Sequence, residues 1–147
     1  NPHAIVFPRV RFEDNPFDFS FSGTKTAVIN YAHNLEQKKE LLNVPDIAAS
    51  FTEAVCEVLT DHAVRAAIAQ NSNRLVLAGG VAANAFLREK LTDACRKNGL
   101  NFFMPLRSYC GDNAAMIASQ GYYEYLAGNL ADETLNGYAN QSIETLR

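Results

Sequence analysis

The sequence predicts an α/β fold built around a parallel sheet. Two short apolar runs, residues 75–78 and residues 100–104, have the length and composition of buried strands. A stretch with helical spacing of apolar residues separates them, and this order predicts a right-handed crossover between parallel strands. With 147 residues, 48% of them hydrophobic, the chain is long enough for one sizeable core and too short for two ordinary domains.

The N-terminal part is expected to contribute two further strands. Residues 17–22 alternate aromatic and polar side chains, which is the pattern of a half-buried strand, and Gly23 ends the run. Residues 4–7 form an apolar stretch that is expected to pair with it. A β-hairpin or a pair of neighbouring strands is therefore predicted here.

Two helices are predicted next. The first begins near Thr24 and precedes the charged residues 36–40. Pro45 disfavours helical geometry in the residue before it, so the second helix is expected to start with Asp46 as its N-cap and to last until residues 71–73. His62 falls on the apolar stripe of this helix, and a packed core histidine is favoured over a catalytic one.

The remaining elements follow from glycine, proline and capping residues. The helix after residues 75–78 is expected to end at Gly99, and Pro105 stops the strand that follows. The last helix should begin near Asp112 or Asn113 and end at Gly128. Residues 129–147 are polar and are expected to form a weakly packed tail.

Composition excludes several classes of protein. The net charge of -3 provides no basic field for nucleic acid, so any RNA affinity would have to be local. The three cysteines form no CxxC pair, which argues against a disulfide framework and for reduced, cytoplasmic thiols. No apolar run reaches the roughly 20 residues that span a bilayer, so no membrane association is expected. Because the chain starts at Asn1 and enters an apolar run at once, we expect a fragment of a larger protein.

The glycine pair Gly79 and Gly80 is the first candidate site. Glycine lets the backbone turn tightly and lets a ligand touch it, and the following helix points unpaired N–H groups and its positive dipole end toward that ligand. Asn84 is expected on the first turn of this helix, where its amide can both donate and accept toward a sugar or base. Spacing alone leaves an ordinary tight turn with a surface asparagine as an equal alternative.

Asp112 is the second candidate, as a metal ligand beside the carboxyl edge of the sheet. The alternative, favoured on local grounds, is that Asp112 or Asn113 caps the last helix. A single carboxylate cannot hold a catalytic metal, and the sequence has no HExxH motif. Cys110 is interpreted as a buried structural thiol rather than a nucleophile.

Positive charges give weaker signals. Lys25 follows the Ser22–Gly23 turn without a complete phosphate-binding loop, so projection into water is slightly favoured over a phosphate contact. Scattered basic residues could form an edge for RNA, but a solvated helix face is the commoner meaning; they are Arg88, Lys90, Arg96, Lys97 and Arg107.

Three segments taken together resemble the TsaD family, in this order: residues 19–26, residues 77–84 with Leu87 and Arg88, and residues 112–118. That family comprises the tRNA threonylcarbamoyladenosine-forming transferases, formerly described as O-sialoglycoprotein endopeptidases or glycoproteases. The resemblance extends from residues 7–9 to the final helix.

The resemblance implies a two-lobed actin-like, sugar-kinase-like (ribonuclease H-like) fold, with residues 1–128 as most of the second lobe. It implies transfer of a threonylcarbamoyl group from threonylcarbamoyl-AMP to N6 of the adenosine beside the anticodon. By matching motifs, Gly79, Gly80 and Asn84 would contact the nucleotide part of the substrate. Asp112 would be one ligand of a divalent iron or zinc ion, whose two histidine ligands belong to an upstream HxxxH motif.

The implied partners are tRNA and, in bacteria, a TsaB-like inactive paralogue and a TsaE-like ATPase. The chain departs from the family pattern at Gly111, where threonine is usual, and at Thr24, where leucine is usual. We expect the fragment alone to be inactive. Two alternatives remain open, a metal-dependent glycoprotein endopeptidase and a non-catalytic paralogue that acts as a dimerisation partner.

Overall fold

The computed structural model describes residues 1–137, 139–140 and 142. These residues form two compact units, Asn1–Gly111 and Asp112–Arg147, and each is described by itself.

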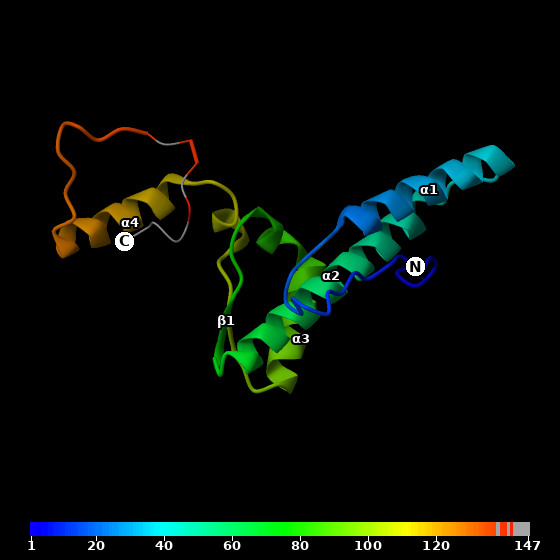
Figure 1. Ribbon diagram of the computed structural model, residues 1–147, viewed down its shortest axis with the longest axis horizontal. Coiled ribbons are helices and arrows are strands. Elements are labelled where there is room, and N and C mark those ends of the chain that lie inside the picture. Colours follow the sequence, from blue (N-terminus) through cyan, green and yellow to red (C-terminus); the bar gives the residue numbers. More distant parts are fainter. Residues whose placement is uncertain (138, 141, 143–147) are drawn as a thin grey trace. The chain divides into compact units, whose positions relative to one another are not determined.

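The first unit is an α/β arrangement around one long helix (Figure 1). Helices α1 (Ser22–Lys38) and α3 (Ala85–Lys97) both pack against α2 (Val44–Ala69), and β1 (Arg74–Val76) also contacts it. The strands β1 and β2 are parallel, with Leu75 opposite Phe102. The α/β class and the parallel strand–helix–strand unit are thus confirmed. The elements are α1 (Ser22–Lys38), α2 (Val44–Ala69), β1 (Arg74–Val76), the 3-10 helix η1 (Gly80–Ala83), α3 (Ala85–Lys97), β2 (Asn101–Phe103) and the 3-10 helix η2 (Arg107–Tyr109).

Two buried clusters make up the core, and α2 contributes to both. Near its start, Ile47 and Ala54 enclose Phe7, which is 2% exposed. Further along, Cys56 packs with Leu87 and Leu91 of α3. Because α2 is covered on more than one side, its buried residues are not confined to the single predicted stripe.

The predicted N-terminal strands are wrong. Residues 1–21 contain no strand, and Ser22 already begins α1. A strand is stable only with a hydrogen-bonded neighbour, and side chains hold these residues along α2 instead. Phe19 stacks on His62 with ring centroids 5.3 Å apart, and His62 Nδ1 hydrogen-bonds the Asp18 carbonyl at 3.1 Å. The alternation of residues 17–22 therefore reflects aromatic anchors rather than a pleated strand.

His62 itself is a packed core residue, as predicted, with 1% of its surface exposed. The start of α2 differs from prediction, because Asn43 rather than Asp46 is its N-cap. The Asn43 side chain accepts a hydrogen bond from Asp46 N at 3.2 Å. Pro45 lies within the first turn, where a helix leaves its N–H groups unpaired in any case, so proline costs nothing there.

The sheet is smaller and more open than the sequence predicts. Strand β1 starts one residue earlier and ends two earlier than residues 75–78, although Leu77 N still donates to Phe103 O at 2.9 Å. Val76 and Phe103 are 69% and 51% exposed. Within the first unit, therefore, the strands are covered on one face and not on both.

The second unit contains α4 (Ala114–Ala127). Asn113 caps its start by accepting from Met116 N at 3.2 Å, and Gly128 ends it with a φ of 77°. Both limits agree with the prediction. Residues 129–137 contain no helix or strand. Across the described part of the chain, no helix is both long and apolar enough to cross a membrane.

Candidate functional site

The Gly79–Gly80 turn begins three residues after the end of β1 and is open to its surroundings. Gly79 has φ 89° and ψ 174°, a conformation that residues with a Cβ rarely adopt. The φ of Gly80 is not in the left-handed region, so its backbone conformation does not require glycine. A Cβ built on either glycine would meet no atom within 4 Å. The backbone of this turn is therefore accessible from outside, and packing within the first unit does not explain the glycine at position 80.

Asn84 is the N-cap of α3, one residue before the first turn where it was expected. Its Oδ1 accepts from Leu87 N at 3.0 Å, so the oxygen is committed to the helix. The residue is exposed, and none of the hydrogen bonds found among the described residues uses its Nδ2. The amide can thus donate to a ligand, whereas the predicted ability to accept as well is reduced.

Arg88 has a role that the sequence interpretation, which placed it among scattered basic residues, did not predict. Its Nε donates to Ala82 O at 2.6 Å, and its Nη2 donates to Pro105 O and lies 3.5 Å from Cys110 Sγ. The side chain is therefore not part of a solvated basic edge. Its position four residues after Asn84, hence on the same side of the helix, was the signal in the sequence.

The first two of the three sequence motifs come together in the first unit. Phe19 lines a small cavity of about 110 Å³ together with Leu77, which directly follows β1, and Leu87 of α3. Thr24 is 3% exposed and its Oγ1 donates to Pro8 O at 3.1 Å, which anchors the start of α1. Lys25 is exposed. This motif supports the scaffold around the Gly79–Gly80 turn.

Asp112 is the first residue of the second unit and is exposed. The sequence favoured Asp112 or Asn113 as the cap of the last helix, and Asn113 is the N-cap of α4. The Asp112 carboxylate is therefore not needed for the start of this helix. Within residues 1–137, 139–140 and 142, no three His, Cys, Asp or Glu side chains gather closely enough to hold a metal ion. At Asp112 the described residues thus present a single exposed carboxylate and no cluster of side chains that could hold a metal ion.

The cysteines behave as structural thiols. Cys56, Cys95 and Cys110 are free and buried. Burial raises the pKa of the Cys56 thiol, while nearby Lys90 lowers it and Glu53 raises it further; burial also raises the pKa of Cys95. Higher thiol pKa values mean less thiolate at neutral pH, so nucleophilic chemistry is disfavoured at both positions.

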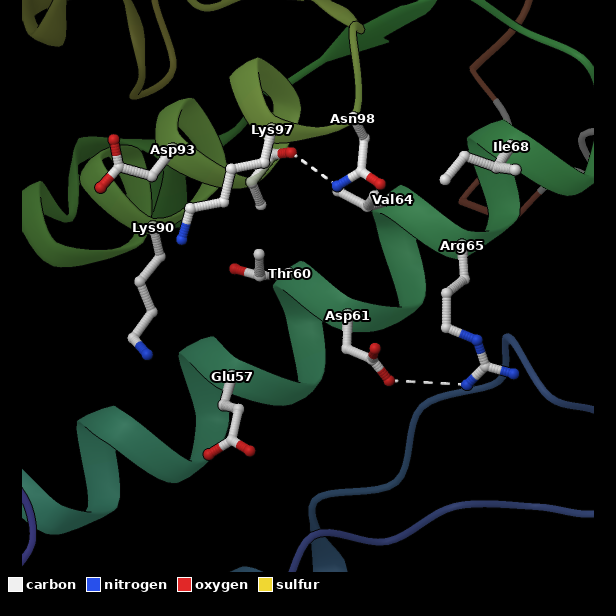
Figure 2. A pocket seen from close by; sticks show the side chains of 11 residues that line it. Glu57, Thr60, Asp61, Val64, Arg65, Ile68, Lys90, Asp93, Lys97 and Asn98 are labelled. Carbon is white, nitrogen blue, oxygen red and sulfur yellow. Dashed lines mark hydrogen bonds and ion pairs between the residues drawn. The ribbon is translucent and has the colours of Figure 1, made fainter.

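A groove of about 540 Å³ lies elsewhere, between α2 and α3 (Figure 2). None of the predicted site residues lines it. Its side chains are of mixed charge, and two of them, Asp61 and Arg65, form an ion pair at 3.5 Å. Lys90 beside the groove is paired with Glu53 at 2.6 Å. The groove does not supply a single-sign surface for nucleic acid.

The sequence matches the family model for TsaD, tRNA N6-adenosine threonylcarbamoyltransferase, over residues 1–119. The chain belongs to the TsaD family. A protein of that name from Staphylococcus epidermidis is 51% identical over 139 residues, which cover 95% of this chain and 41% of the relative. A Staphylococcus saprophyticus relative of the same name is 49% identical over 94% of this chain and 40% of its own length.

A third TsaD relative, from Clostridium perfringens, is 45% identical over 140 residues, again 95% of this chain and 41% of the relative. The chain thus spans about two fifths of the length of these curated relatives. The TsaD match includes the Gly79–Gly80 turn, Asn84, Arg88 and Asp112, and it ends within α4. Residues 120–147 lie beyond it.

Proposed function

We propose that this chain forms the nucleotide-contacting part of a TsaD transferase. The full-length enzyme would move a threonylcarbamoyl group from threonylcarbamoyl-AMP to N6 of adenosine 37 in tRNAs that read codons beginning with A. That reaction is an acyl transfer. Because the chain spans about two fifths of its relatives, the fragment alone would be inactive.

The observation that carries this proposal is the unexplained glycine at position 80. Its φ does not require glycine, and an added Cβ would meet no neighbour within 4 Å. Neither the backbone geometry nor the packing explains why position 80 has no side chain. A glycine there is consistent with close approach of a ligand to the backbone. The position after a strand and before a helix is where α/β proteins bind nucleotides.

Three residues would bind the nucleotide part of threonylcarbamoyl-AMP. Gly79 and Gly80 would let the substrate lie against the backbone. Asn84 would donate a hydrogen bond from Nδ2 while its Oδ1 holds the start of α3. The partial positive charge at the N-terminus of α3 would favour the phosphate.

The rest of the assembly is part of the same proposal. Residues 1–128 would form most of the second lobe of an actin-like enzyme, with nucleotide bound between the lobes. Asp112 would be one ligand of an iron or zinc ion, which could act as a Lewis acid. The other ligands would come from outside the described residues. A TsaB-like paralogue, a TsaE-like ATPase and tRNA would be the partners.

The test is the pair of substitutions Gly80→Ala and Gly137→Ala in a full-length TsaD protein carrying this segment. Both add one methyl group in open space, but Gly137 lies beyond the family match. We expect Gly80→Ala to keep the unfolding temperature and to raise the KM for threonylcarbamoyl-AMP by about 10-fold or more, as a misplaced contact does. Gly137→Ala should match the wild type. Equal KM values for all three proteins would remove Gly80 from the substrate site.

A further inference from the structure

Arg88 connects three segments that are separate in the sequence. Its guanidinium donates to Ala82 O in η1, donates to Pro105 O after β2, and reaches Cys110 Sγ at the end of η2. We call these three contacts the Arg88 bridge. It joins the loop that follows β1 to the loop that follows β2, and all its members belong to the first unit.

The residues at the ends of the bridge are deeply packed. Ala82 is 0% exposed and Cys110 is 3% exposed. In the described part of the chain, Arg88 forms no ion pair with a carboxylate, in contrast to Arg96 on the same helix, which pairs with Asp93 at 2.8 Å. The acceptors of Arg88 are two carbonyls and a thiol. Arg88 therefore holds segments of the chain together and does not neutralise a carboxylate.

The chemistry of the bridge requires arginine. A planar guanidinium presents several N–H donors in a fixed fork, whereas an ammonium group is a point donor on a flexible stem. Only the fork can satisfy acceptors from two loops at once in one fixed orientation. A lysine at position 88 would keep the charge and could donate more than one hydrogen bond, but it would not present its donors in that fixed orientation.

We propose that Arg88 is a positioning residue that fixes the Gly79–Gly80 turn against the segment leading from β2 to Cys110. Its consequence for catalysis rests on the function proposed above. The turn would bind threonylcarbamoyl-AMP, so its precise placement would set the affinity for that substrate. Loosening the bridge would weaken binding of threonylcarbamoyl-AMP and leave binding of tRNA unchanged.

The first arm of the test measures the bridge in the full-length protein without any substrate. Cys110 is labelled with iodoacetamide, and mass spectrometry of peptides distinguishes it from the buried internal controls Cys56 and Cys95. Arg88→Met should raise the labelling rate of Cys110 about 10-fold to 100-fold, the range expected for loss of hydrogen bonds from a charged donor. Arg88→Lys should give an intermediate rate.

Arg96→Met is the matched control, since it removes the same group from the same helix but breaks only an exposed pair. It should label like the wild type. Circular dichroism reports whether each variant is folded, and Arg88→Lys decides the matter if Arg88→Met does not fold. Wild-type labelling of Cys110 in a folded Arg88 variant would overturn the bridge.

The second arm uses the full-length transferase and measures KM and kcat for each substrate separately. We expect Arg88→Lys to raise the KM for threonylcarbamoyl-AMP about 10-fold, in keeping with a misplaced binding element, with the KM for tRNA unchanged. A merely structural residue would lower the amount of active enzyme, and hence kcat, at constant KM; that result would overturn the positioning role. If the wild-type enzyme does not modify tRNA, the proposed function fails, while the labelling arm still decides the bridge.

Discussion

At the scale of single residues, the capping role of Asn84 and its proposed role in substrate binding can be separated by one substitution. Its Oδ1 caps α3 through Leu87 N, and its Nδ2 is free to donate from an exposed position. Aspartate keeps the capping oxygen and suits the helix dipole, but it has no donor. Asn84→Asp therefore removes the Nδ2 donor while the N-cap of α3 is kept.

We expect Asn84→Asp to retain stability while binding of threonylcarbamoyl-AMP to the full-length enzyme weakens. Asn84→Ala should lose both the donor and about 1 kcal/mol of stability, the usual value of an N-cap. Asn43→Ala is the control, because it removes the cap of α2 and should change stability alone. Urea unfolding and equilibrium binding report the two effects. Unchanged affinity in Asn84→Asp would show that the substrate does not need Nδ2.

At the scale of elements, one ion pair joins α2 to α3. Glu53 Oε1 lies 2.6 Å from Lys90 Nζ, and the two side chains are 9% and 28% exposed. The Lys90 ammonium also lies 5.2 Å from the Phe86 ring centroid. Because Glu53 is nearly enclosed, the carboxylate depends on Lys90 for compensation of its buried charge.

Lys90→Met should therefore destabilise the chain by about 1–3 kcal/mol, the cost of leaving a buried polar group without its partner. Adding Glu53→Gln should recover part of that loss, since the unpaired charge is then gone. Arg96→Met breaks an exposed pair and should cost under about 1 kcal/mol. Chemical denaturation of the wild type, the two single variants Lys90→Met and Glu53→Gln, their double variant and Arg96→Met measures this. Additive losses in the double variant would mean that the two groups do not interact.

The same elements show what the sequence can and cannot predict. The α3 limits, the parallel strands and the α4 caps follow from local signals, such as Gly99, Pro105 and Asn113. Residues 17–22 carry the pattern of a strand, yet only the fold decides whether a neighbouring strand is present to pair with them. Local patterns also miss the Arg88 bridge, because its acceptors are brought to one place by the packing of two loops.

At the scale of the whole molecule, the candidate residues are divided between two compact units. The Gly79–Gly80 turn and Asn84 belong to the first unit, whereas Asp112 opens the second. The third sequence motif, residues 112–118, is separated from Cys110 of the Arg88 bridge by one residue, Gly111. We expect substitutions in the two units to affect different observables of the proposed reaction.

Asp112→Asn tests this division because it keeps the size of the side chain and removes its charge. In the full-length enzyme we expect the affinity for iron or zinc, measured by competition with a chelator, to fall by more than about 10-fold, since even neighbours of metal ligands have effects of that size. Asp132→Asn, another exposed aspartate beyond the family match, should bind metal like the wild type. The KM for threonylcarbamoyl-AMP should respond to Gly80→Ala without any change in metal content. Because a metal ligand must act through the ion, an Asp112→Asn enzyme with undiminished metal affinity would exclude that role for Asp112, whatever its activity.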